Sequence, residues 1–207
     1  MSEIKTHTVY TDGACPGNGT EDATGGMGIA RLTGDFYDFA NKGFLWGHHL
    51  TKRYGHPTNQ KCELFAAMIV VSSAALCAQM YKGYLYAKDG KISEMFAIHS
   101  DSKYVVDGVN HWLRNWKQND WKNSKKKTIS NLQMWKDLDL MLSYGHLRGC
   151  VSFSYVPGHS GDPGNEAADE AARLAADGQM EEEFGVGDWS EYMSCLANCV
   201  ENDEWLE

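Results

Sequence analysis

The sequence has no apolar segment long enough to cross a lipid bilayer. Its longest apolar stretch, residues 64–78, contains two serines. That stretch is about 15 residues long, whereas a membrane-spanning helix needs roughly 20. Residues 1–12 also lack the apolar core of a secretory signal. These absences predict a protein without a membrane partner, in which residues 64–78 form a buried helix.

Proline is scarce, and the cysteines do not form a disulfide framework. With 43% hydrophobic residues and only four prolines, the composition is that of a globular domain. A chain of 207 residues is long enough for one core of ordinary size but not for two. The six cysteines are scattered over positions 15, 62, 77, 150, 195 and 199. This scatter predicts a reducing compartment.

Basic residues are missing from the end of the chain. Residues 177–207 contain ten acids and no Lys or Arg. The net charge of −9 would by itself argue against a polyanionic partner. Without this segment, however, 18 acids face 19 bases, so the rest of the chain is mildly basic. We therefore divide the chain into a body, residues 1–176, and an acidic extension, residues 177–207.

The periodicity of apolar residues predicts an alternation of strands and helices. Strands are predicted at 6–14, 27–32, 36–46, 95–100 and 151–156. Helices are predicted at 62–80, 102–113, 129–144 and 165–176. The first three strands have short links, which favours an antiparallel meander. The order as a whole predicts an α/β fold with a mixed five-stranded sheet, in which parallel strands follow the meander and helices flank the sheet.

Four acidic residues lie where this fold would gather side chains. Asp12 and Asp101 end predicted strands, whereas Glu63 and Asp169 lie near the starts of predicted helices. Active sites of such sheets lie at the carboxyl ends of parallel strands. Four neighbouring carboxylates cannot all stay charged without a cation. Oxygen ligands select Mg²⁺ or Mn²⁺, and a pair of such ions is the usual apparatus of phosphodiester cleavage.

Each of these carboxylates also has an ordinary structural explanation. Asp12 precedes a glycine and could be a turn residue. Glu63 could complement a helix dipole, and Asp101 could cap the helix that follows it. Asp169, expected about one turn into its helix, could simply be solvated. Their joint occurrence is what favours a metal site.

Four sequence frames, in this order, resemble ribonuclease H type 1. They are YTDGACPGN at 10–18, TNQKCELFAA at 58–67, SDSKYV at 100–105 and VPGHSGDPGNEAADEAA at 156–172. The resemblance covers residues 6–176, which makes the body the expected catalytic domain with a ribonuclease H-like fold. It implies an endoribonuclease that hydrolyses the RNA strand of RNA–DNA hybrids by two-metal-ion catalysis and leaves 5′-phosphate and 3′-hydroxyl ends.

The resemblance also assigns expected roles to single residues. Asp12, Glu63, Asp101 and Asp169 match the catalytic carboxylates that hold two Mg²⁺ ions, with Mn²⁺ as an alternative. His159 matches a catalytic histidine in a mobile loop, where it would assist proton transfer or product release.

A basic protrusion between the third and fourth frames is expected to grip the DNA strand. Its candidate substrate-binding residues are Trp112, Trp116, Lys117, Trp121 and Lys122. Lysines would contact phosphates, and aromatic faces would pack on sugars or bases. The alternative is that the tryptophans hold helices together and the lysines form a solvated surface.

Further residues match positions that contact the hybrid. Asn18, Asn59 and Gln60 match minor-groove contacts, where 2′-hydroxyls distinguish RNA from DNA. Thr58, Ser124 and Asn131 match positions near a phosphate of the DNA strand. We therefore expect the RNA–DNA hybrid as the macromolecular partner.

Other interpretations remain open at this stage. The chain could be another nuclease or a transposase of the same superfamily, or a hybrid-binding module with an inactive site. We expect a cytoplasmic monomer, associated with the nucleoid in a prokaryote or nuclear in a eukaryote. The acidic extension would dock on the body, bind an unknown partner, or occupy the basic groove as a nucleic-acid mimic.

Overall fold

The computed structural model describes residues 4–31, 42–80, 85, 92–143, 147 and 149–179. Within these residues, five strands form one mixed sheet in the order β3-β2-β1-β4-β5. The strands are β1 (Lys5–Ala14), β2 (Gly26–Arg31), β3 (Lys42–Leu45), β4 (Glu94–Ser100) and β5 (Val151–Tyr155). The meander β1-β2-β3 is antiparallel, and β4 pairs in parallel with both β1 and β5. The predicted fold class is therefore confirmed.

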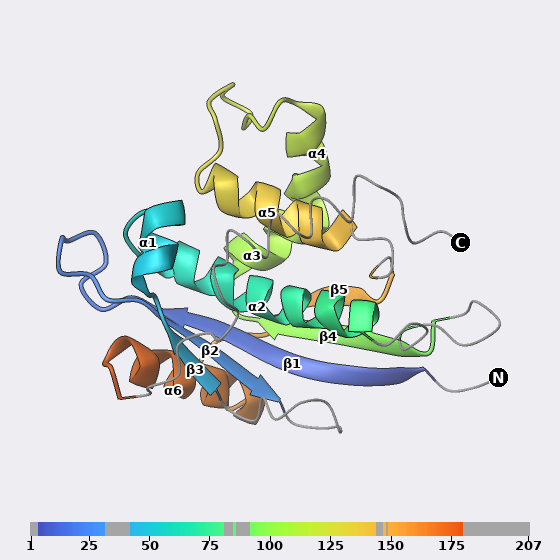
Figure 1. Ribbon diagram of the computed structural model, residues 1–207, viewed down its shortest axis with the longest axis horizontal. Coiled ribbons are helices and arrows are strands. Elements are labelled where there is room, and N and C mark those ends of the chain that lie inside the picture. Colours follow the sequence, from blue (N-terminus) through green and yellow to red (C-terminus); the bar gives the residue numbers. More distant parts are fainter. Residues whose placement is uncertain are drawn as a thin grey trace.

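Helices cover both faces of this sheet (Figure 1). They are α1 (His48–Tyr54), α2 (Asn59–Met80), α3 (Lys103–Asp107), the π-type turn η1 (Gly108–Trp112), α4 (Leu113–Gln118), α5 (Leu132–Ser143) and α6 (Pro163–Ala176). Helices α2, α3 and α5 lie on one face, and α6 is the helix that the described part of the chain places on the other. In the described part of the chain, no helix combines the length and apolarity needed to cross a membrane.

Several predicted boundaries were wrong. Helix α1 was not predicted, because its seven residues show no clear apolar period. The helix predicted at 102–113 is instead three consecutive segments that continue to Gln118. Helix α6 begins two residues early, because Asp162 caps it by accepting hydrogen bonds from the backbone N–H groups of Gly164 (2.9 Å) and Asn165 (3.1 Å). Asp169 consequently lies six residues after the start of its helix rather than the predicted four.

Some predicted segments lie partly or wholly outside the described residues. Of the strand predicted at 36–46, the structure describes only the part from residue 42 onward. The acidic extension is described only to Gln179, so the division of the chain at residue 176 and the roles suggested for the extension stay predictions.

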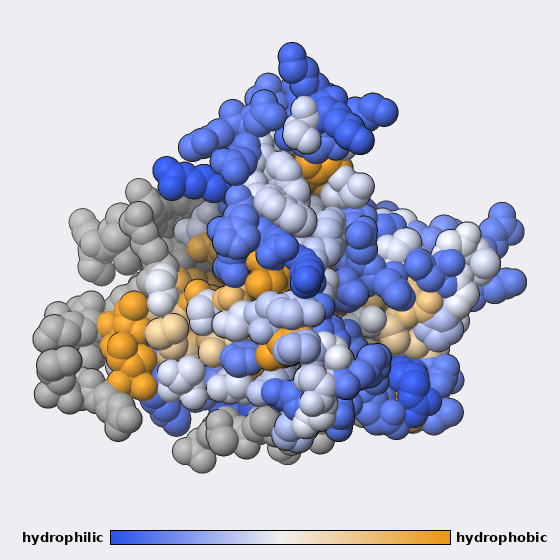
Figure 2. Space-filling model, turned by 180° about the vertical axis from the view of Figure 1, so that it is seen from behind, coloured by the Kyte–Doolittle hydropathy of each residue, from blue (hydrophilic) through white to orange (hydrophobic). Residues whose placement is uncertain are grey.

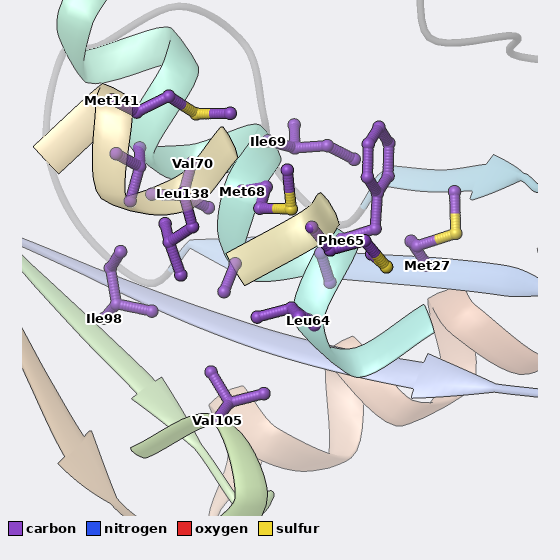
Figure 3. Close-up of a cluster of buried hydrophobic side chains, with 14 of the residues drawn as sticks. Met27, Leu64, Phe65, Met68, Ile69, Val70, Ile98, Val105, Leu138 and Met141 are labelled. Atoms are coloured by element: carbon purple, nitrogen blue, oxygen red, sulfur yellow. The ribbon is translucent and has the colours of Figure 1, made fainter. Parts of the chain in front are cut away.

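The main apolar core lies between the sheet and helices α2 and α5 (Figure 3). Helix α2 is buried on all sides along residues 64–71, as the apolar run predicted. Its side chains meet Ile98 from β4 and Leu138 and Met141 from α5. Burial of this kind contributes roughly 1.5–3 kcal/mol for each large aliphatic side chain. The core therefore fixes the helix that carries Glu63 close to its N-terminus.

On the opposite face, α6 lies in backbone contact with β2. A Cβ atom added at Gly28 would lie 1.9 Å from the carbonyl oxygen of Ala168. Gly28 is the register partner of Asp12 on β1. The missing side chain therefore lets the helix approach closely enough to place Asp169 beside the strand that carries Asp12.

A buried ionic network joins α1 to α5. The carboxylate of Asp137 is 4% exposed. It accepts hydrogen bonds from Arg53 Nε (2.9 Å) and Nη2 (3.0 Å), from Tyr54 Oη (2.6 Å) and from Gln133 Nε2 (2.8 Å). A buried charge is tolerated when its lone pairs are used in this way. The network holds α1 in place just before the predicted substrate-binding residues 58–60.

Replacing Gly28 with Ala should destabilise the protein by about 1–3 kcal/mol, the usual cost of forcing extra atoms into a packed site. The added carbon meets a backbone carbonyl, so truncating Ala168 to Gly in the same chain should not restore stability. Thermal melts of the single and double variants test this. A double variant as stable as Ala168→Gly alone would show that side chains, not backbone, limit the approach.

Candidate active site

Asp12 lies at the centre of the carboxylate cluster. It is 8% exposed, in the strand that pairs with both β2 and β4. Its pKa is raised to about 8, chiefly by burial and also by the nearby charges of Asp101 and Asp169, against the lowering effect of a hydrogen bond from the backbone of Gly13. The side chain of Asp169 lies within hydrogen-bonding reach of Asp12. Two carboxyl groups this close need a shared proton, which a cation would replace.

Asp101 follows the last residue of β4, so it reaches the same edge of the sheet. Its Oδ2 accepts a hydrogen bond from Asn165 Nδ2 at 3.1 Å. The chain at Gly158 packs directly on this oxygen, because a Cβ atom there would lie 2.6 Å from it. Asp101 is thus enclosed between the start of α6 and the loop that precedes it.

Glu63 approaches from α2, which meets the end of β1 in backbone contact. A Cβ atom at Gly13 would lie 2.1 Å from the backbone nitrogen of Glu63. Ser102 Oγ donates a hydrogen bond to Glu63 Oε2 at 2.6 Å. Burial raises the pKa of Glu63, the bond from Ser102 lowers it, and the charge of Asp101 raises it. The charge of Glu63 is therefore coupled to the carboxylate cluster through Asp101.

The structure thus brings all four predicted carboxylates to one edge of the sheet. In the described residues, however, no three His, Cys, Asp or Glu side chains are arranged to enclose a metal ion by themselves. Mg²⁺ typically keeps several waters and binds through one or two carboxylates together with substrate phosphates. A half-enclosed set of carboxylate oxygens around a buried Asp12 fits such an ion.

His159 lies in the loop between β5 and α6, next to the glycine that packs on Asp101. Its side chain is exposed, and its backbone φ of 51° falls in the left-handed region. Ser160 Oγ donates to the carbonyl of Pro157 at 2.7 Å and closes the turn. The loop therefore presents a histidine at the rim of the cluster rather than within it.

The predicted protrusion, residues 111–131, consists of the end of η1, helix α4 and the loop that follows it, at the top of Figure 1. Figure 2 shows that its tip is hydrophilic. Ser124, Lys125, Lys126 and Lys127 are exposed there. Lys117 pairs with Asp139 at 2.8 Å, and Lys122 lies 3.5 Å from Asp120. The protrusion is therefore a basic surface with two of its lysines already paired.

The tryptophans of the protrusion were predicted either to pack on the nucleic acid or to hold helices together, and the structure distinguishes among them. Trp116 packs edge-on against the fully buried Trp135, with ring centroids 5.2 Å apart, so it holds helices together. Trp121 is half-buried against the core. Trp112 is 38% exposed, and its ring is tilted by 54° against that of Trp116, with the centroids 5.6 Å apart. Of the three tryptophans, Trp112 therefore exposes the most aromatic surface.

The remaining predicted contacts lie around the same edge. Asn18, Asn59 and Gln60 are exposed. Thr58 Oγ1 accepts from the backbone N–H of Lys61 at 3.3 Å, so it also caps α2. Asn131 Nδ2 donates to Tyr104 Oη at 3.1 Å, which commits part of its side chain to the fold.

Two further residues, Ser102 and Asn165, were missed by sequence reasoning. Both lie inside the four frames, immediately after Asp101 and four residues before Asp169. A serine before a predicted helix signals a cap, but nothing in its position predicts a bond to a carboxylate 39 residues away.

The family model for RNase H matches residues 4–177. The chain belongs to the ribonuclease H family. The Ribonuclease H of Enterobacter sp. (strain 638) is 34% identical over 178 residues, covering 86% of this chain and 93% of that protein. The Ribonuclease H of Alcanivorax borkumensis is 33% identical over 174 residues, covering 84% and 93%.

Solved ribonuclease H structures share the fold. LC9-RNase H1, described as a type 1 RNase H with the type 2 active-site motif, has a TM-score of 0.55 at 26% identity, covering 94% of this chain and 86% of that one. A foamy viral protease–reverse transcriptase in complex with an RNA/DNA hybrid has a TM-score of 0.57 at 21% identity, covering 82% of this chain and 20% of that one. Members of this family are metal-dependent hydrolases.

Replacing Asp12 with Asn should stabilise the metal-free protein at pH 8. Folded Asp12 has a pKa of about 8, against about 4 in an unfolded chain. At intermediate pH the folded state therefore holds a proton that the unfolded state has lost. The free energy of unfolding consequently decreases as the pH rises towards and through 8. Asn has no charge to bury, so Tm at pH 8 in EDTA should rise by roughly 2–8 °C.

Melts of both proteins from pH 5 to pH 9 measure this, with the exposed Glu170→Gln as a matched control. The advantage of Asp12→Asn should grow with pH. An equal pH slope in the two proteins would mean that Asp12 is ionised in the metal-free fold.

Proposed function

We propose that this ribonuclease H cuts the RNA strand of RNA–DNA hybrids by hydrolysis and leaves 5′-phosphate and 3′-hydroxyl ends. The proposal includes Asp12, Glu63, Asp101 and Asp169 as the residues that would hold two Mg²⁺ ions. The observation that carries it is the buried Asp12, which lies against two other carboxylates at the carboxyl end of the parallel strands. An arrangement this unfavourable without a cation is typical of a catalytic metal site.

When bound, such ions supply a hydroxide nucleophile at neutral pH and neutralise charge on the leaving 3′-oxygen. The residues of the chain would bind these ions and orient the substrate. Rigid elements carry the carboxylates: Asp12 lies on a strand, Asp101 directly after one, and Glu63 and Asp169 on helices. His159, at the exposed rim, would take up or deliver a proton and assist departure of the product.

Substrate recognition is proposed for two surfaces beside the carboxylates. The exposed amides of Asn18, Asn59 and Gln60 can both donate to and accept from a 2′-hydroxyl, which is the group that separates RNA from DNA locally. The protrusion would hold the DNA strand through lysines and the exposed face of Trp112. The hybrid bound in the foamy viral structure of the same fold supports this class of substrate.

The unaltered chain should cleave the RNA strand of a labelled hybrid with Mg²⁺ and not with EDTA. Asp12→Asn should lose at least about 100-fold in rate, because a metal ligand is lost, while hybrid binding persists. Glu170→Gln, an exposed neighbour of Asp169 paired with Arg173, should cleave normally. Hybrid binding without cleavage by the unaltered chain would favour an inactive binding module, and cleavage of duplex DNA would favour another nuclease.

Neutralising Lys125, Lys126 and Lys127 to Gln should weaken hybrid binding without a comparable change in kcat. Each lost phosphate contact should reduce the slope of log K against log salt by about 0.9. Lys5→Gln, at the end of β1 remote from Asp12, should leave the slope unchanged. An unchanged slope in the triple variant would identify these lysines as solvated surface only.

A further inference from the structure

Two buried neutral side chains hold two of the four carboxylates. Ser102 is 5% exposed and bonds to Glu63, and Asn165 is 2% exposed and bonds to Asp101. Neither belongs to the proposed metal ligands. Both lie at helix starts, where the backbone is fixed: Ser102 caps α3, and Asn165 lies in the first turn of α6.

Ser102 is restrained from three directions. Its Oγ accepts the backbone N–H of Val105 at 3.3 Å and caps α3. Its backbone N–H donates to the Oγ of Ser100, which is 1% exposed, at 3.1 Å. The single hydroxyl proton is left for Glu63 Oε2, and the 2.6 Å separation is the short distance typical of a charge-assisted bond. The hydroxyl therefore joins α3 to α2 in one orientation.

Asn165 is held in a comparable way. Its backbone N–H donates to the capping Asp162 Oδ1 at 3.1 Å, and its Nδ2 donates to Asp101. Its Oδ1 is buried and has no hydrogen-bond partner among the described residues. An unpaired buried acceptor lowers stability, so packing alone does not account for an amide here. The bond to Asp101 is the feature that an apolar residue of the same size would lose.

We propose that Ser102 and Asn165 are positioning residues that hold Glu63 and Asp101 in their metal-binding orientations before an ion arrives. Glu63 and Asp101 repel each other, and free side chains would turn apart. Lys or Arg could restrain them too, but a fixed positive charge would compete with the cation. A hydroxyl and an amide orient the carboxylates and leave their negative charge available.

The proposal rests on the proposed metal-dependent function, and it predicts a specific defect. Loss of a partner that orients a metal ligand typically costs 10–100-fold in metal affinity or activity. Ser102→Gly keeps most of the capping, since Gly is nearly as good a cap as Ser, but removes the bond to Glu63. Asn165→Leu keeps the approximate shape and removes the bond to Asp101. Ser102→Thr keeps both the cap and the donor.

The test measures Mg²⁺ dependence in two ways: the rise of Tm with Mg²⁺ in the absence of hybrid, and the Mg²⁺ concentration for half-maximal cleavage. Ser102→Gly and Asn165→Leu should raise the Mg²⁺ requirement about 10–100-fold, with kcat partly restored at high Mg²⁺. Ser102→Thr should remain close to the unaltered chain.

Controls separate positioning from stability. Ser72→Ala removes a buried hydroxyl that bonds to a backbone carbonyl in α2, and Asn110→Leu removes an amide that bonds to the backbone of β5. Both can lower Tm but should leave the Mg²⁺ requirement unchanged. Folded Ser102→Gly and Asn165→Leu proteins with an unchanged Mg²⁺ requirement would overturn the proposal, as would an unaltered chain without any Mg²⁺ response. Hybrid cleavage by the unaltered chain tests the proposed function separately.

Discussion

Close backbone contact between helices and the sheet is the constraint on which the catalytic edge depends. Helix α6 reaches β2 because Gly28 has no side chain, and α2 reaches the end of β1 because Gly13 has none. Both contacts lie next to Asp12: Gly13 follows it in β1, and Gly28 is its register partner in β2. A methyl group at either position would push a carboxylate-bearing helix outward, so the ligand geometry is fixed by main-chain packing.

This packing concentrates negative charge where water is largely excluded. Hydrophobic burial along α2 and the alanine face of α6 provides the stability that offsets it. The carboxyl group of Asp12, whose pKa is raised to about 8, therefore lies beside two close contacts between helix and sheet. Stability and catalysis place opposite demands on this edge, as is common at functional sites.

Much of the architecture followed from periodicity. The alternation in residues 6–14 and the apolar run after Glu63 are local signals, and the structure confirms both elements. Helix α1 was missed because its stability comes from the long-range network around Asp137 rather than from its own sequence. The early start of α6 was missed because the apolar periodicity begins only after Asp162 and Pro163, although together these two residues form a strong helix start.

In the candidate site, the four sequence frames predicted the carboxylates but not the residues that hydrogen-bond to them. The bonds from Ser102 and Asn165 join residues 39 and 64 positions apart, so no local pattern contains them. The same limit applies to the tryptophans of the protrusion. Trp112 and Trp116 look equivalent in the sequence, but only the neighbourhood of Trp135 decides which one is exposed.

The backbone of the protrusion has a further consequence for how this protein can change. Four of its non-glycine residues, Asp120, Trp121, Lys126 and Asn131, have φ between 48° and 58°. Asp and Asn tolerate this region, whereas Trp and Lys are strained there, and glycine would relieve the strain at either position. Substitution towards glycine would therefore make this segment easier to fold while removing the charge and aromatic surface that it presents. Selection for thermostability and selection for grip on a nucleic acid would drive these positions in opposite directions.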